Sequence, residues 1–278
     1  KFFDIDLKDE LAFFQPTAKA GELFEIPVLN SDATVDRLYL IGFADHSLSA
    51  LRTAGAALGR KVRGKAVELI SLCAESKSEI RAHGVSILLG TYSWSLKTGK
   101  TAEIATIAIA TKDSGAVAEA AILARALYTA RDLIHTPSNI KTPLWIAQEA
   151  KKIADEKGLA ITVLAGKDLA KFGGLRAVGN SSPNPGPRFI EMTYIPRGKA
   201  RSAAALPHVV IVGKGITFDT GGVSLKRPYE FMTAMKSDMA GAAAALATIS
   251  ALPDLQPQIK VTVLLMCAEN ALSGTSQR

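Results

Sequence analysis

Cysteine, histidine and aromatic residues are scarce in this chain. Its 278 residues include two cysteines and four histidines, and 6% of them are aromatic. Cys73 and Cys267 each sit in an apolar run and lack the spacing of a metal or redox motif, so we expect two buried free thiols. So few cysteines favour a reducing compartment, which predicts a cytoplasmic protein.

The sequence has no long hydrophobic run, and its first residues do not predict a signal peptide. No run reaches the roughly 18 apolar residues of a membrane span, and the longest, 242–252, contains a threonine and a serine. The first six residues become acidic at position 4, unlike the basic start and longer apolar core of a signal peptide. We therefore expect no membrane association.

Common catalytic motifs are also absent from the sequence. There is no His-Glu-x-x-His pattern, which excludes the common zinc-protease arrangement, and no Gly-x-Ser-x-Gly nucleophile elbow. The histidines lack ligand spacing, so we interpret each as a structural or surface residue. They are His46, His83, His135 and His208.

The chain has few acidic residues relative to basic ones. Its net charge is +7 and its isoelectric point is about 9.4, which suits anionic partners such as DNA. The densest basic cluster, residues 60–65, has no interleaved aromatic side chains for stacking on bases. A solvated helix end is therefore the favoured interpretation, and DNA binding stays an alternative.

The first half of the chain alternates strand-like and helix-like segments. Such alternation predicts an α/β protein with a largely parallel sheet and helices on its faces. A length of 278 residues is enough for two domains. The expected strands are 35–43, 66–73 and 103–110, and the expected helices are 48–58 and 78–89.

A long alanine-rich helix is predicted over 115–134, because Leu123, Leu127, Ala130 and Ile134 form one apolar stripe. Pro137 cannot continue this helix, and we place the domain boundary there, giving domains 1–135 and 136–278. In the second domain we expect helices over 143–157, 167–172 and 237–252, and strands over 159–164, 189–195, 209–212 and 259–266.

The run 212–226 combines glycines with Lys214, Asp219 and Lys226, and Asp238 follows twelve residues later. This composition indicates a polar site that backbone and ligand approach closely. The run does not fit the phosphate loop G-x-x-x-x-G-K-[ST]. A single Asp-Thr-Gly copy argues against an aspartic protease, which needs two.

Each of these residues also has a plainer interpretation. Lys214 and Lys226 suit solvated lysines, Asp219 suits an Asx turn, Asp238 suits a helix cap, and Met235 suits an ordinary core methionine. Residue type and spacing leave both sets of interpretations open.

The run 212–226, together with Met235–Met239, closely resembles the metal-binding signature of the leucyl aminopeptidase (cytosol aminopeptidase) family of two-metal exopeptidases. Residues 130–139 and 172–189 also resemble this family, and 54–60 and 88–92 do so more weakly. The resemblance implies a smaller N-terminal α/β domain ending in a linking helix. An α/β catalytic domain with a central mixed sheet would follow, incomplete at its C-terminus.

The resemblance also implies a role for each site residue. Lys214 would bind a metal through its neutral amine, Asp219 would bridge two metal ions, and Asp238 would be a further metal ligand. Lys226, in its charged form, would contact the substrate carbonyl and stabilise the oxyanion. Met235 would line the pocket for the substrate's first side chain.

The implied activity is hydrolysis of the N-terminal peptide bond of peptides at a two-metal centre. A metal-bound hydroxide would be the nucleophile, with Lys226 as the electrophile. Zinc or manganese is expected, with magnesium as a third candidate, and the resemblance implies a homo-hexamer. The alternatives are a truncated, non-catalytic family member and a DNA-binding protein.

The sequence departs from the family pattern at two places. Arg227 lengthens the loop to Asp238 by one residue. The sequence ends at Arg278, before the family's Asn-Thr-Asp-Ala-Glu-Gly-Arg run, which supplies two more metal-binding carboxylates and an arginine that holds a bicarbonate. We therefore expect this sequence to be part of a longer protein and to have little or no peptidase activity alone.

Overall fold

A computed structural model of the protein describes residues 5–29, 34–99, 102–182 and 184–273. The chain forms two compact units, residues 1–124 and 125–278. The division falls inside helix α4 (Ser114–His135), whereas the sequence places a domain boundary after this helix. The predicted domain limits of 1–135 and 136–278 stay a prediction.

Unit 1 contains two small sheets. β1 and β2 pair antiparallel, and β3 and β4 pair parallel. The expectation of one largely parallel sheet is therefore wrong here, because the short connection between β1 and β2 leaves no room for a crossover helix. The elements are α1 (Leu7–Phe14), β1 (Leu23–Pro27), β2 (Arg37–Ile41), α2 (Leu48–Val62), β3 (Glu68–Ser71), α3 (Lys77–Thr91) and β4 (Thr106–Ile109).

Helices α2 and α3 begin where the sequence supplies capping residues. The Ser47 side chain accepts a hydrogen bond from the backbone N–H of Ala50, and Ser76 forms a capping box with Glu79. At its other end, α2 ends at Val62, inside the basic cluster 60–65. Cations in a last helical turn complement the helix dipole, which agrees with the predicted helix end.

His83 lies fully buried on α3 and makes two hydrogen bonds. Its Nδ1 is 3.1 Å from the carbonyl oxygen of Leu51, and its Nε2 is 2.9 Å from the Ser71 hydroxyl. A carbonyl only accepts, so Nδ1 carries the hydrogen and Nε2 accepts from Ser71. The interpretation of this histidine as structural is confirmed.

We expect unit 1 to lose stability as the pH falls below about 6.5. Burial lowers the pKa of His83, and the bond to Leu51 opposes this only in part. Below the ordinary histidine pKa of about 6.5, the unfolded chain therefore binds a proton that the folded chain does not, which favours unfolding. Urea titrations from pH 7.5 to 5 measure the free energy of unfolding, and NMR follows the protonation of the His83 imidazole in the folded protein. Titration of folded His83 at or above pH 6.5 would contradict the prediction.

The two cysteines are free thiols, as expected, but only one is fully buried. Cys267 is completely buried, and burial raises its pKa to about 12. Cys73 is half-buried, so its predicted full burial is wrong, because it lies just past the end of the short strand β3. Burial raises the pKa of Cys73 as well.

Unit 2 is built on one four-stranded sheet with strand order β5-β6-β8-β7. β5–β6 and β6–β8 pair antiparallel and β7–β8 pair parallel, which confirms the mixed sheet. Its elements after α4 are α5 (Pro143–Lys157), β5 (Ala160–Ala165), η1 (Gly166–Leu169), α6 (Gly173–Gly179), β6 (Arg188–Tyr194), η2 (Ala200–Ala205), β7 (His208–Asp219), η3 (Tyr229–Ser237), α7 (Ala240–Leu255) and β8 (Lys260–Asn270).

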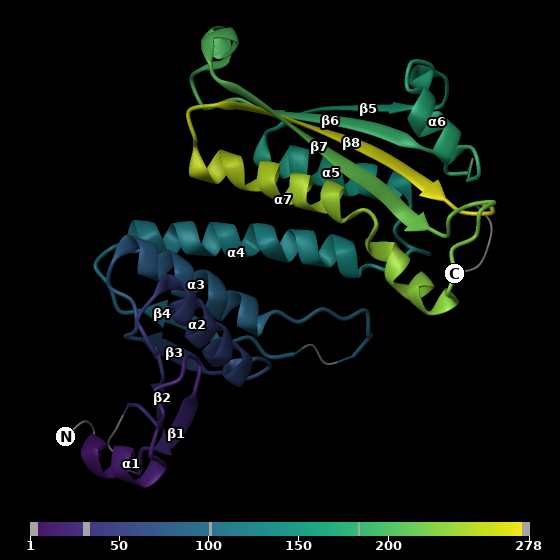
Figure 1. Ribbon diagram of the computed structural model, residues 1–278. Coiled ribbons are helices and arrows are strands. Elements are labelled where there is room, and N and C mark those ends of the chain that lie inside the picture. The colour runs from purple at the N-terminus through teal and green to yellow at the C-terminus, as the bar shows by residue number, and fades with distance from the viewer. Residues whose placement is uncertain (1–4, 30–33, 100–101, 183, 274–278) are drawn as a thin grey trace. The chain divides into compact units, whose positions relative to one another are not determined.

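Helices α5 and α7 cover one face of this sheet (Figure 1). The helix over 143–157 has the predicted limits, with the Thr142 side chain capping its start and Gly158 left-handed after its end. Odd-numbered residues of β8, among them Val263 and Leu265, are buried in the core with α5 and α7. Even-numbered residues face the other side of the sheet.

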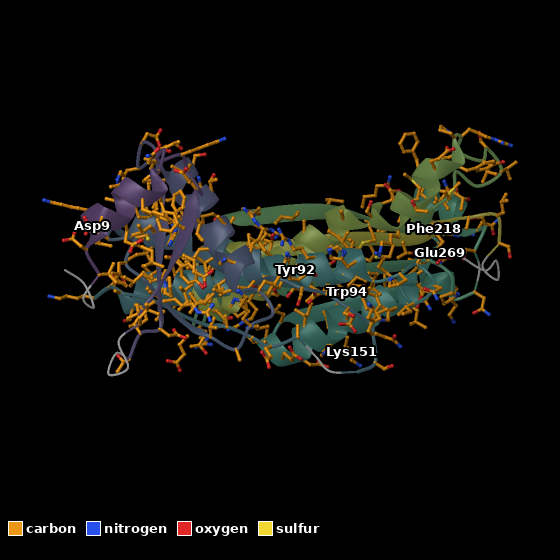
Figure 2. The ribbon with its side chains drawn as sticks, turned by 90° about the horizontal axis from the view of Figure 1, so that it is seen from below. Asp9, Tyr92, Trp94, Lys151, Phe218 and Glu269 are labelled. Atoms are coloured by element: carbon orange, nitrogen blue, oxygen red, sulfur yellow. The ribbon has the colours of Figure 1, made fainter. Side chains whose placement is uncertain are left out.

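In the described residues, none of the helices combines the length and apolarity that crossing a membrane requires. The ends of β7 and β8 lie together in unit 2, where Figure 2 labels Phe218 and Glu269. Both side chains are almost fully buried. This end of the sheet positions the polar residues discussed next.

Candidate metal centre

A β-bulge brings Lys214 and Asp219 to one face of β7. The strand spans His208–Asp219, longer than the predicted 209–212, so Lys214 lies within the strand and not after it. Successive strand side chains alternate, which would put these two residues on opposite faces. Between Ile216 and Asp219 the pairing with β8 shifts register, and the bulge turns Asp219 toward the Lys214 side.

Three donors converge on the Asp219 carboxylate. Oδ2 lies 2.6 Å from Lys226 Nζ, while Oδ1 accepts from Asn270 Nδ2 at 2.7 Å and from the Gly221 backbone N–H at 3.0 Å. Burial alone would raise the pKa of Asp219, but these hydrogen bonds outweigh it and lower the pKa. Asp219 is therefore held as an anion.

The loop after Asp219 folds back so that Lys226 can reach it. The Lys226 backbone N–H donates to the Thr220 carbonyl at 2.9 Å. Gly221 and Gly222 both have left-handed φ angles, +91° and +67°, and a Cβ at 221 would overlap the Ser224 carbonyl oxygen. Only glycine fits this turn without strain.

Lys226 also reaches Met235 on η3, with its Nζ 3.2 Å from the Met235 sulfur. Met235 is half-buried, and no residue of η3 is buried, so the interpretation as a core methionine is wrong. Arg227, the extra loop residue, stacks its guanidinium 4.3 Å from the Tyr229 ring centroid. The insertion leaves the Lys226–Asp219 contact in place.

Asp238 lies between η3 and α7 and pairs with Lys214. Lys214 Nζ is 2.8 Å from both carboxylate oxygens, but hydrogen-bond geometry is met only at Oδ1. Oδ2 is buried and has no hydrogen-bond partner in the described part of the chain. α7 starts after Met239 without a side-chain cap, so the helix-cap interpretation of Asp238 is wrong.

Two lysine–aspartate pairs thus form beside each other along β7 and its neighbouring loops. The Asx-turn interpretation of Asp219 is confirmed by its bond to Gly221, but Asp219 also binds Lys226. The two lysines are partly exposed, with side chains 60% and 41% accessible for Lys214 and Lys226, yet each is paired. Neither is a freely solvated lysine.

Asn270 is a site residue that sequence reasoning missed. It is the last residue of β8, and besides its bond to Asp219 its backbone carbonyl accepts from Thr220. The signal was available in the sequence, because ligands gather at the carboxyl ends of parallel strands in α/β sheets. A polar residue ending an apolar strand next to β7 meets that condition.

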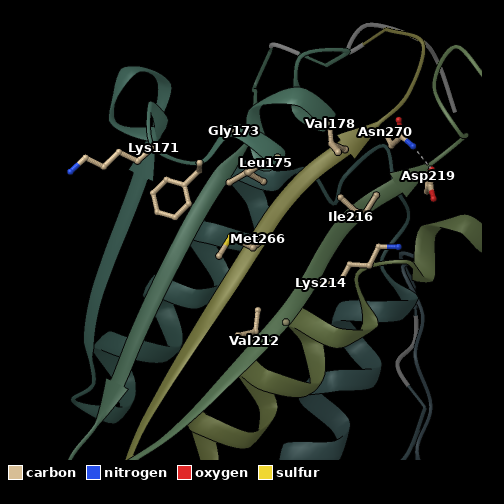
Figure 3. Close-up of a pocket in the computed structure, with 13 residues that line it drawn as sticks. Lys171, Gly173, Leu175, Val178, Val212, Lys214, Ile216, Asp219, Met266 and Asn270 are labelled. Carbon is tan, nitrogen blue, oxygen red and sulfur yellow. Dashed lines mark hydrogen bonds between the residues drawn. The ribbon is translucent and has the colours of Figure 1, made fainter.

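A cavity of about 790 Å³ opens beside these residues on the sheet face opposite α5 and α7 (Figure 3). Its walls are mostly apolar, with Val212 and Ile216 from β7 and Met266 from β8. Lys214, Asp219 and Asn270 give it a polar end. This is the general character of a small-molecule site: apolar walls with a few convergent polar groups.

The polar groups fit divalent cations. Two carboxylates and an amine are suitable ligands for zinc or manganese, and the buried, unsatisfied Oδ2 of Asp238 is an acceptor without a donor. No cluster of three or more His, Cys, Asp or Glu side chains suited to a metal is found within the described ranges. A metal site here would therefore draw on donors besides carboxylates, for which Lys214 is a candidate.

Comparison with known proteins places this chain in a family. The catalytic domain of the cytosol aminopeptidase family matches residues 128–278, and the chain belongs to that family. A probable cytosol aminopeptidase of Aquifex aeolicus is 33% identical over 94% of this chain and 54% of its own length. One from Geotalea uraniireducens is 34% identical over 99% of this chain and 59% of its own length.

Solved structures agree with the sequence comparison. The bottromycin maturation enzyme BotP, in complex with Mn, superposes with a TM-score of 0.83 at 31% identity. The superposition covers 99% of this chain and 59% of BotP. The cytosol aminopeptidase of Coxiella burnetii shares the fold, with a TM-score of 0.76 at 24% identity. The chain spans a little over half the length of these relatives.

Proposed function

We propose that these residues form part of a metal-dependent aminopeptidase centre that hydrolyses the N-terminal peptide bond of peptides. The observation that carries the proposal is the convergence of two lysines and two aspartates at the end of β7. One buried carboxylate oxygen there, Asp238 Oδ2, lies 2.8 Å from Lys214 Nζ but does not meet hydrogen-bond geometry with it. Family membership agrees with this chemistry.

In this proposal Lys214, Asp219 and Asp238 would hold two divalent ions, and Asp219 would be the shared ligand that the family resemblance implies. Divalent ions at such a site polarise a carbonyl and activate water. Lys214 and Asp238, which pair with each other in this structure, would both hold an ion at this site. In this structure the two lysine–aspartate pairs balance the charges of these four residues.

Lys226 is the proposed electrophile and substrate-binding residue. Its Nζ lies 2.6 Å from Asp219 Oδ2 and 3.2 Å from the Met235 sulfur, so its charge is held next to a proposed metal ligand. A charged donor fixed there stabilises negative charge that develops on a substrate carbonyl oxygen. Met235 is the residue that we propose contacts the first side chain of the substrate.

Several finer features belong to the same proposal. Manganese is favoured as the ion by the Mn-bound relative, with zinc and magnesium as alternatives. A homo-hexamer, a cytoplasmic location and a bicarbonate in a full-length form follow from the family resemblance. DNA binding is supported only by the net charge of +7. Because the chain spans little over half of its relatives, activity is proposed for the complete polypeptide.

We expect Lys226→Met to lower kcat for leucinamide hydrolysis by about 10²–10³-fold, because an oxyanion-stabilising donor acts mainly in the transition state. The measurement is steady-state hydrolysis by the complete polypeptide with added Mn²⁺. Lys157→Met is the matched control, because Lys157 forms a 2.6 Å pair with Asp254 between α5 and α7, away from the site. Unchanged kcat in Lys226→Met would remove the assigned role.

A further inference from the structure

The C-terminal end of α4 has every carbonyl of its last turn satisfied. A helix leaves its last four C=O groups without intrahelical partners. Here the Asp132 carbonyl accepts from the backbone N–H and the hydroxyl of Thr136, at 3.1 and 2.8 Å. Three carbonyls then remain, and lysine side chains bind all of them.

Lys141 provides the first of these lysine contacts. Its Nζ donates to the carbonyls of Leu133 and Ile134, both at 3.0 Å, and the residue is fully buried. It lies only a few residues after the helix, so this contact is local. A cation at this position also interacts favourably with the negative end of the helix dipole.

Lys236 provides the second contact, and it comes from a distant part of the chain. Its Nζ donates to the His135 carbonyl at 2.7 Å, across 101 positions of sequence. Lys236 lies on η3 (Tyr229–Ser237), between Met235 and Asp238. Lys236 also contributes, after burial, to lowering the pKa of Lys141 to about 8, so the two ammonium groups lie close together.

Few side-chain hydrogen bonds fix η3, although it also packs against β7 and is followed by Asp238, which pairs with Lys214. η3 buries no residue and has no side-chain cap at its start. The hydroxyls of Thr233 and Ser237 bond only to carbonyls within η3 itself. Among the described residues, two side-chain hydrogen bonds connect η3 to other parts of the chain. One joins Met235 to Lys226, and the other joins Lys236 to the carbonyl of His135 at the end of α4.

We propose that Lys236 is a positioning residue that ties η3 to the carbonyl end of α4 and thereby fixes Asp238 and Met235 at the metal centre. The proposal rests on the proposed function, because it assigns Lys236 to the placement of a ligand of that centre. Lys236 touches no metal or substrate group itself. It acts through the backbone of η3, which ends one residue before Asp238.

A purely electrostatic role and a positioning role of Lys236 predict opposite changes in metal affinity when its charge is removed. Removing a positive charge beside a cation site should tighten metal binding by simple Coulomb repulsion. Losing the tether should weaken binding, because groups that orient a ligand typically contribute 10–100-fold to metal affinity. The direction of the change therefore distinguishes a positioning role from a charge effect.

The test compares Lys236→Met, Lys236→Arg and Lys141→Met by Mn²⁺ titration calorimetry and by hydrogen exchange of the metal-free protein. We expect Lys236→Met to weaken Mn²⁺ binding about tenfold and to speed exchange in residues 229–238, with Lys236→Arg restoring both. Lys141→Met is the matched control. It removes two bonds from the same helix end but none to η3, so it should lower thermal stability and leave both readouts unchanged.

Each outcome bears on one proposal or the other. Absence of Mn²⁺ binding in the unmodified complete polypeptide contradicts the proposed function, and hydrogen exchange then still decides the role of Lys236. Unchanged exchange over 229–238 in Lys236→Met overturns the positioning role. So does Mn²⁺ binding that stays equal or becomes tighter in that variant.

Discussion

Replacing Asp219 with asparagine should reduce Mn²⁺ affinity at least about 100-fold. The variant removes the negative charge of the proposed bridging ligand. The NH₂ group of the new asparagine would also face Lys226 Nζ or Asn270 Nδ2, and these are hydrogen-bond donors themselves. Because hydrogen bonds to charged groups contribute about 1.5–3 kcal/mol each, we also expect the free energy of unfolding to fall by about 2–3 kcal/mol. Calorimetry and urea unfolding measure the two effects.

Asp254→Asn is the matched control for this substitution. Asp254 is 2.6 Å from Lys157, the same separation as Asp219 from Lys226, but it lies on α7 away from the metal centre. Its side chain is more exposed, 34% against 13%, so we expect a loss of under about 1 kcal/mol and unchanged Mn²⁺ binding. Equal effects in both variants would show that Asp219 is only a structural ion-pair residue.

Replacing Gly59 with alanine should destabilise unit 1 by about 2 kcal/mol, the upper part of the range for overpacking after the gain in helix propensity. α2 and α3 cross so closely that a Cβ at 59 would overlap the Ile87 carbonyl oxygen and lie 2.8 Å from the Gly90 Cα. Overpacking of this kind typically costs 1–3 kcal/mol, and a clash with backbone allows little relief. The helix propensity of alanine, about 1 kcal/mol better than glycine, offsets only part of the loss.

Gly115→Ala is the comparison for this prediction, because Gly115 also lies in a helix of unit 1. A Cβ there meets only Asp113 Oδ1 at 3.4 Å, an ordinary contact. We expect Gly115→Ala to be neutral or stabilising by up to about 1 kcal/mol in urea unfolding. Equal free energies of unfolding in Gly59→Ala and Gly115→Ala would contradict the close approach of α2 and α3 at Gly59.

Local sequence signals predicted most helices and many strands. The helix 143–157 has its expected limits because Thr142, Pro143 and Gly158 act on their own neighbourhood. The pairing of β1 with β2 was missed, because strand partners depend on residues distant in sequence. β7 was predicted too short, since its glycines weaken the strand pattern although neighbouring β8 supports it.

The candidate site, too, was predicted only in part from the sequence. The sequence identified Lys214, Asp219, Lys226 and Asp238 as unusual, and the family resemblance is confirmed. Residue types could not show that Lys214 pairs with Asp238 and Lys226 with Asp219. Asn270 and Lys236 were missed for a related reason: their partners lie 51 and 101 positions away.

The sequence by itself determined the family and the limits of the helix 143–157, because these depend on residue identity and neighbouring positions. The expected helix 237–252 is displaced to 240–255, and the expected helix 167–172 is a 3-10 segment at 166–169. Only the tertiary structure decided which charges meet. The bulge in β7 turns Asp219 to the face of Lys214, and the lysine contacts at the end of α4 connect η3 to the site. Hydrogen bonds and ion pairs act over a few ångströms of space, and chain folding alone brings distant residues within that range.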